Sequence, residues 1–118
     1  MKLDLREKDG VSILDITGEI TVTGGDQMLR EAIDTLAGSG RNYILLNLSQ
    51  VEFMDSAGLG ELVAGYRLMD RIGGKLKIVN APPKVYNSLT IAKLLPIFEV
   101  YEDEDEAVKS FQKEKEPE

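Results

Sequence analysis

The sequence contains no cysteine and no histidine among its 118 residues. Without cysteine the chain can form no disulfide and has no thiol nucleophile, and without either residue the usual zinc ligands are missing. The absence of histidine also removes the commonest general base of enzymes. Only carboxylates, lysines and tyrosines remain for acid–base chemistry, and their spacing shows no convergent pair. These absences argue against a small α/β enzyme, and we expect no catalytic activity.

Long apolar runs and clusters of positive charge are also missing. No stretch approaches the roughly 20 apolar residues of a membrane-spanning helix, and the first six residues, MKLDLR, lack the apolar run of a signal peptide. The net charge is −7, with 11 basic and 12 acidic side chains in residues 1–98 but 3 and 9 in residues 99–118. The chain has no basic stripe of the kind that nucleic acids require. We therefore expect a soluble, cytoplasmic protein that neither inserts into membranes nor binds nucleic acid.

Apolar residues fall into strand-like and helix-like patterns along the chain. Strands are predicted at 3–5, 11–16, 43–48, 75–79 and 97–101. Helices are predicted where apolar residues recur at helical spacing, at 26–36, 57–72, 83–92 and 103–111. Asp9 and Gly10 supply the turn of an N-terminal hairpin, and Asp26 is the expected N-cap of the first helix. The residues of the third helix that are expected to face inward are Val85, Leu89 and Ala92.

The order of these segments is β-β-α-β-α-β-α-β-α. It predicts one α/β domain with a mixed, largely parallel sheet of about five strands and four helices, joined by right-handed crossovers. The segment 43–48 is continuously apolar, as expected for a central strand that is covered on both faces. We assign residues 1–112 to the domain and the charged residues 113–118 to a disordered tail.

The segment around Ser56 is the main candidate for a functional site. It follows the central strand, at the carboxyl edge of the sheet where α/β proteins tend to bind ligands and partners. The Ser56 hydroxyl stands directly before a helix, beside Asp55, and the small residues that follow leave it accessible. A phosphate on Ser56 would face the helix amides and the positive end of the helix dipole, although Asp55 would repel it. The alternative is that Ser56 only caps the helix, which is a frequent role of serine.

Two roles, packing and binding, are open for the residues next to Ser56. Gly58 and Gly60 either let another protein approach the hydroxyl or permit close packing of the helix on the sheet. Phe53 and Met54 are expected to pack rather than to bind. One face of the second helix points away from the predicted core stripe, and we expect it to contact a partner. That face carries Glu61, Ala64, Gly65 and Leu68.

Three stretches of the chain resemble one known family. The central stretch is DSAGLG at 55–60, preceded by VEFM at 51–54. The second is TGEI at 17–20, and the third is LLPIFEVY at 94–101, which an acidic helix start follows. Together they resemble the STAS-domain anti-sigma factor antagonists over residues 3–112, in the same order along the chain.

The resemblance implies a protein that switches partners. In that family the unphosphorylated antagonist binds an anti-sigma factor, typically a serine kinase, and thereby releases a sigma factor. The kinase phosphorylates the serine that matches Ser56, which breaks the complex, and a metal-dependent serine/threonine phosphatase reverses the modification. The antagonist holds no cofactor or metal, since ATP and magnesium belong to the kinase. The residues implied in partner binding are Thr21, Asp55, Ala57, Gly58, Leu59, Gly60 and Glu61.

One position departs from the family pattern. The motif at 17–20 is commonly followed by an aspartate close to the phosphorylated serine, whereas this chain has Thr21. Because Thr21 cannot supply a carboxylate, either the kinase recognises this chain differently or the chain is a weaker substrate. The alternative function is a STAS scaffold that does not switch, such as a stressosome-type component or the soluble subunit of a lipid transporter.

Overall fold

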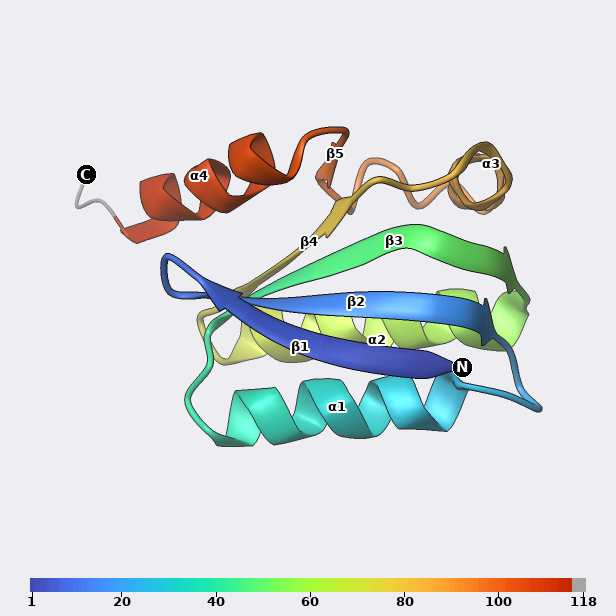
Figure 1. Ribbon diagram of the computed structural model, residues 1–118, viewed down its shortest axis with the longest axis horizontal. Coiled ribbons are helices and arrows are strands. Elements are labelled where there is room, and N and C mark those ends of the chain that lie inside the picture. The colour runs from blue at the N-terminus through green and yellow to red at the C-terminus, as the bar shows by residue number, and fades with distance from the viewer. Residues whose placement is uncertain (116–118) are drawn as a thin grey trace.

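The computed structural model describes residues 1–115 and contains nine elements in the predicted order (Figure 1). The strands are β1 (Lys2–Lys8), β2 (Val11–Ile20), β3 (Tyr43–Met54), β4 (Lys75–Val79) and β5 (Val100–Tyr101). The helices are α1 (Asp26–Gly38), α2 (Ser56–Arg71), α3 (Pro83–Ile91) and α4 (Glu104–Lys115). Among the described residues, no helix is long and apolar enough to cross a membrane.

The five strands form one mixed sheet in the order β1-β2-β3-β4-β5. β1 pairs antiparallel with β2 through a two-residue turn, in which Asp9 and Gly10 have positive φ angles of 51° and 81°. Positive φ at both positions gives the turn the twist that a tight hairpin needs. The remaining neighbours, from β2 to β5, all pair in parallel. The predicted mixed α/β fold is therefore confirmed.

Helices cover both faces of the sheet (Figure 1). α1 and α2 lie side by side on one face, below the strands in Figure 1, and α3 adds Val85 and Leu89 to the same core. α4 covers the opposite face, where Phe111 packs with Ile13 and Leu45. Because Leu45 faces α4 whereas its neighbours in β3 face α1 and α2, the prediction of a central strand covered on both faces is also confirmed.

A buried lysine helps to hold α4 on the sheet. The side chain of Lys77 on β4 is only 2% exposed, and its ammonium nitrogen lies 3.2 Å from a carboxylate oxygen of Glu99. The same group donates to the Ser110 hydroxyl at 3.0 Å and to the Glu114 carboxylate at 3.3 Å, both on α4. It also lies 4.8 Å from the centroid of the Phe111 ring, within range of a cation–π interaction. Two carboxylates and a hydroxyl thus surround the buried ammonium group, as burial of a charged group requires.

Three strands are longer than predicted and one is shorter. β1 spans Lys2–Lys8 rather than 3–5, because it pairs with β2 along its whole length. β2 continues to Ile20 and β3 to Met54, because these two residues pair at the end of the parallel ladder. The predicted strand at 97–101 is reduced to the two residues of β5. The strand prediction is wrong for residues 97–99. The N–H of Ile97 donates to the Leu94 carbonyl at 2.9 Å and closes a turn there instead.

Two predicted details of helix ends are wrong. Gly25, not Asp26, is the N-cap residue of α1, and it has a left-handed φ of 96°. A Cβ at Gly25 would lie 2.6 Å from the Glu19 carbonyl oxygen, so the close approach of the backbone itself requires glycine. Ala92 is exposed just beyond the last residue of α3, and therefore does not face the core.

Asp103 caps α4, and the helix ends later than predicted. The N–H of Glu106 donates to the Asp103 carboxylate at 2.9 Å, which satisfies one of the free amides of the first turn. The helix continues to Lys115, so residues 113–115 belong to it rather than to the assigned tail. Residues 116–118 of that tail lie outside the described residues.

Candidate functional site around Ser56

The candidate site lies where β2 and β3 end together. The two strands are parallel, so the loop after β2 and the start of α2 come from the same end of the sheet, on the right in Figure 1. The N–H of Asp55 donates to the Ile20 carbonyl at 3.4 Å across this end. Residues 21–25 therefore lie beside Asp55 and Ser56, although at least 30 positions separate them in sequence.

Asp55 is the N-cap of α2 and also holds the neighbouring loop. One carboxylate oxygen accepts the Gly58 N–H at 2.9 Å, and the other accepts the Val22 N–H at 3.0 Å. The hydrogen bond from Val22 first, and that from Gly58 second, hold the pKa of the Asp55 carboxyl below its ordinary value. Because the hydrogen bonds favour the charged form, Asp55 is a carboxylate at neutral pH.

The alternative that Ser56 caps α2 is wrong. Ser56 is the first residue of the helix and is exposed, because Asp55 occupies the cap position. The Ser56 hydroxyl makes no hydrogen bond with any residue from 1 to 115. It therefore stands at the positive end of the α2 dipole without a hydrogen-bond partner among the described residues.

The structure separates the roles of the two glycines that follow. Gly58 is buried, and a Cβ at this position would lie 2.1 Å from the Ile20 carbonyl oxygen. Gly58 is therefore required for close packing of α2 against the end of β2. Gly60 is exposed, and a Cβ there would meet nothing within 4 Å. It lies one helical turn after Ser56, on the same face of α2, so it keeps the surface beside the hydroxyl low.

Ala57 and Leu59 are half-buried residues between these positions. Leu59 packs against the core below α2, and its N–H donates to the Asp55 carbonyl at 3.0 Å. Its contribution is thus to hold the first turn of the helix in place, while Ser56 and Gly60 form the outer surface.

Thr21 lies near the site, but its side chain faces the loop. It is 7% exposed, and its hydroxyl donates to the Gly24 carbonyl at 3.2 Å. Its N–H donates to the same carbonyl at 2.8 Å. Thr21 therefore shapes the turn that presents Val22, which is 67% exposed.

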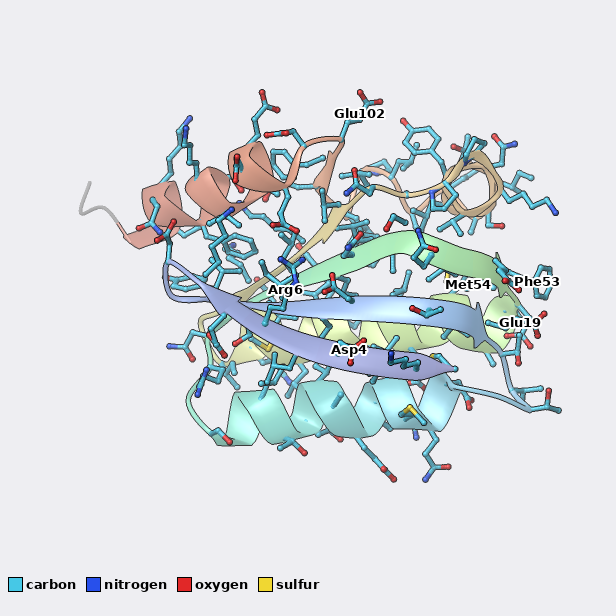
Figure 2. All side chains as sticks on the ribbon, in the orientation of Figure 1. Asp4, Arg6, Glu19, Phe53, Met54 and Glu102 are labelled. Carbon is cyan, nitrogen blue, oxygen red and sulfur yellow. The ribbon has the colours of Figure 1, made fainter. Side chains whose placement is uncertain are left out.

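Phe53 projects into solvent beside the site, whereas Met54 is buried. The Phe53 side chain is 51% exposed and that of Met54 is 4% exposed. The prediction that both residues pack is thus correct for Met54 and wrong for Phe53. Figure 2 shows Phe53 at the end of β3, close to Glu19, with which it pairs across the two strands. Phe53 at the end of β3 and Val22 in the loop after β2 are two exposed apolar residues at this end of the sheet.

The face of α2 that was expected to meet a partner is partly covered by α1. The Glu61 side chain is 6% exposed and forms an ion pair with Arg30 of α1, with one N–O distance of 3.0 Å. Gly65 is buried, and a Cβ there would lie 2.8 Å from the Ile33 side chain. Glu61 and Gly65 therefore do not point away from the packed elements as expected, because these positions join α2 to α1; contact of this face with a partner stays a prediction. Ala64 is exposed, and Leu68 is half-buried.

The sequence did not reveal that the Val22 N–H binds the Asp55 carboxylate, or that Phe53 points outward. No sequence signal distinguishes Phe53 from Met54, because both are apolar and adjacent. Val22 could have been found only from the pairing that brings the loop after β2 to Asp55.

Comparisons with known proteins agree with this architecture. The pattern of the STAS domain matches residues 2–107. The anti-sigma F factor antagonist of Paenibacillus polymyxa is 26% identical over 108 residues, which cover 92% of each chain. The anti-sigma-B factor antagonist of Bacillus subtilis is 29% identical over 100 residues, 85% of this chain and 90% of that one. The crystal structure of an anti-sigma factor antagonist from Mycobacterium paratuberculosis has a TM-score of 0.84 at 25% identity, covering 94% of this chain and 93% of the other. The chain belongs to the STAS domain family.

Proposed function

We propose that the protein is an anti-sigma factor antagonist that binds an anti-sigma factor through the surface around Ser56. Relatives named as antagonists match this chain over most of their length. The observation that carries the proposal is the exposed Ser56 hydroxyl. It is not used as a helix cap, because Asp55 caps α2. Val22 and Phe53 supply apolar contacts beside it, and Gly60 leaves room for close approach.

Phosphorylation of Ser56 would reverse the binding. A phosphate adds about −1.5 to −2 charges at a surface that is otherwise suited to close contact. An uncompensated charge buried in an interface costs about 3–5 kcal/mol, which corresponds to a loss of roughly two to three and a half decades of affinity. The N-terminus of α2 would meanwhile stabilise the phosphate on the free domain. The switch thus needs no change of fold.

The partners, not the antagonist, add and remove the phosphate. The anti-sigma factor is a serine kinase that uses ATP and magnesium, and a serine/threonine phosphatase removes the phosphate. The antagonist itself catalyses nothing, holds no cofactor and acts in the cytoplasm.

Intact-mass spectrometry tests the assignment. The purified protein is incubated with each candidate anti-sigma kinase and magnesium ATP, alongside Ser56→Ala and Ser49→Ala. Ser49 is a matched control, because it is an exposed serine on β3, away from the start of α2. We expect one phosphate on the wild type and on Ser49→Ala, and none on Ser56→Ala. Phosphate on Ser56→Ala would contradict the assignment of the site.

Thr21 favours a second candidate function. The family's aspartate is replaced by a side chain that is buried in the loop and carries no charge. A STAS scaffold that binds without switching would tolerate this replacement. Tight binding to a kinase without any phosphate transfer would favour the scaffold over the switch.

A further inference from the structure

The thioether of Met1 packs against the N-cap of α1. Met1 is half-buried and contacts the main hydrophobic core. A Cβ added at Gly25, the N-cap residue, would collide with the Met1 sulfur and would lie 3.1 Å from the Met1 Cβ. A Cβ added at Gly18 would lie 3.4 Å from the Met1 Cα. Both glycines are thus covered by Met1, and Figure 1 shows the N end of the chain beside the start of α1.

Met1 reaches the Ser56 surface through one short turn. Gly25 is the last residue of the turn at 21–25. Near the other end of this turn, the Val22 N–H donates to the Asp55 carboxylate at 3.0 Å. Met1 and Asp55 therefore contact opposite ends of the segment that presents the Val22 side chain, which is 67% exposed.

The four methionines differ in their access to solvent. Met54 and Met69 are buried, at 4% and 0% exposure, whereas Met28 is 46% exposed and Met1 is half-buried. An oxidant dissolved in water therefore reaches Met28 and Met1 before the other two. Met28 lines the groove between β1 and α1, and its exposure leaves room for an added oxygen to stay hydrated.

We propose that Met1 is an oxidation site that controls partner binding at the Ser56 surface, an inference that rests on the proposed function. Hydrogen peroxide transfers one oxygen atom to the Met1 sulfur. The sulfur–oxygen bond forms as the oxygen–oxygen bond breaks, the thioether is oxidised to a sulfoxide, and the peroxide is reduced to water.

The sulfoxide does not fit the contact that the thioether makes. The Met1 sulfur and the Glu19 carbonyl oxygen both lie beside the position that a Cβ of Gly25 would take. Oxidation adds a polar acceptor there, next to a carbonyl that is itself an acceptor and cannot donate to it. Because an acceptor without a donor must stay in water, the oxidised side chain leaves Gly25. The turn then loses its support at that end, and Val22 is held less firmly.

Two reciprocal variants isolate the two accessible methionines. Met28→Leu leaves Met1 as the accessible thioether, and Met1→Leu, released from a cleavable N-terminal fusion, leaves Met28. Leucine has nearly the volume of methionine, so both variants should fold with little loss of stability. Dilute hydrogen peroxide should add one oxygen atom to each variant in intact-mass spectrometry, and peptide mapping should place it at the remaining accessible methionine.

Amide hydrogen exchange and partner binding then test the consequence. In oxidised Met28→Leu, we expect the Val22 amide to exchange several-fold faster and the anti-sigma factor to bind several-fold more weakly than in the reduced form. In Met1→Leu, the same treatment should change neither quantity. Unchanged exchange and affinity in oxidised Met28→Leu, equal losses in Met1→Leu, or resistance of Met1 to the peroxide would overturn the proposal. If the reduced protein bound no anti-sigma factor, the proposed function would fail, and the exchange of the Val22 amide would still decide this inference.

Discussion

The Asp55 carboxylate accepts a hydrogen bond from the backbone N–H of Val22 at 3.0 Å, although 33 positions separate the two residues. The same carboxylate caps α2 through Gly58. One side chain thus fixes both the loop after β2 and the first turn of the helix that carries Ser56. The free Ser56 hydroxyl is a consequence of this arrangement.

Replacement of Asp55 and of Ser56 should affect stability very differently. Asp55→Ala removes the cap of α2 and the anchor of Val22, so we expect a clearly lower urea midpoint. Ser56→Ala removes a hydroxyl that has no partner among the described residues, and its midpoint should stay within experimental error. Equal losses in the two variants would show that Ser56 does contribute to the cap.

The contribution of Asp55 should disappear in acid. Its pKa is lowered in the folded protein by the N–H groups of Val22 and Gly58. A carboxyl with a depressed folded pKa stabilises the fold above its unfolded pKa, near 3.8, and loses that contribution as the pH falls through the folded value. Urea unfolding of wild type and Asp55→Asn should therefore show a constant difference between pH 5 and 7 that shrinks below about pH 4. A difference that persists unchanged at pH 2 would contradict this explanation.

Alanine substitutions at the two glycines should have opposite signs. Gly58→Ala forces a Cβ against the Ile20 carbonyl, and overpacking of this kind costs about 1–3 kcal/mol. Gly60→Ala adds a methyl group in open space on a helix, where alanine is favoured over glycine by about 1 kcal/mol. Thermal or urea unfolding measures both. Destabilisation by Gly60→Ala would mean that the surface beside Ser56 is more crowded than described.

Lys77 should be replaceable by methionine but not by alanine. Its stem is buried under α4, while its partners Glu99 and Glu114 are 54% and 31% exposed and can return to water. Lys77→Met keeps the volume, so the change in the free energy of unfolding should stay below about 1.5 kcal/mol. Lys77→Ala leaves a cavity and should cost about 2–5 kcal/mol. A large loss in Lys77→Met would show that the charge, rather than the packing, holds α4.

The fold was largely predictable because its signals are local and periodic. The continuous apolar run at 43–48 identified the central strand, and Asp9-Gly10 identified the hairpin turn. Strand ends were less predictable, since β2 and β3 extend only because Ile20 and Met54 pair with each other. The two-residue β5 likewise depends on its neighbour β4.

The candidate site was predictable in place but not in detail. The position of Ser56 at a helix start followed from the sequence, but two adjacent residues, Asp55 and Ser56, were both suitable caps. Only the three-dimensional contact with Val22 and Gly58 decides between them. Burial of Glu61 was missed for a similar reason, because its partner Arg30 lies on another helix.

The affinity of the protein for its anti-sigma factor, measured before and after phosphorylation of Ser56, tests the central claim most directly. Isothermal titration with the purified partner gives both values, and Ser56→Ala supplies a form that cannot be modified. The unphosphorylated protein and Ser56→Ala should bind alike, and the phosphorylated protein should bind roughly two to three and a half decades more weakly. Equal affinity of the phosphorylated and unphosphorylated forms would contradict the account.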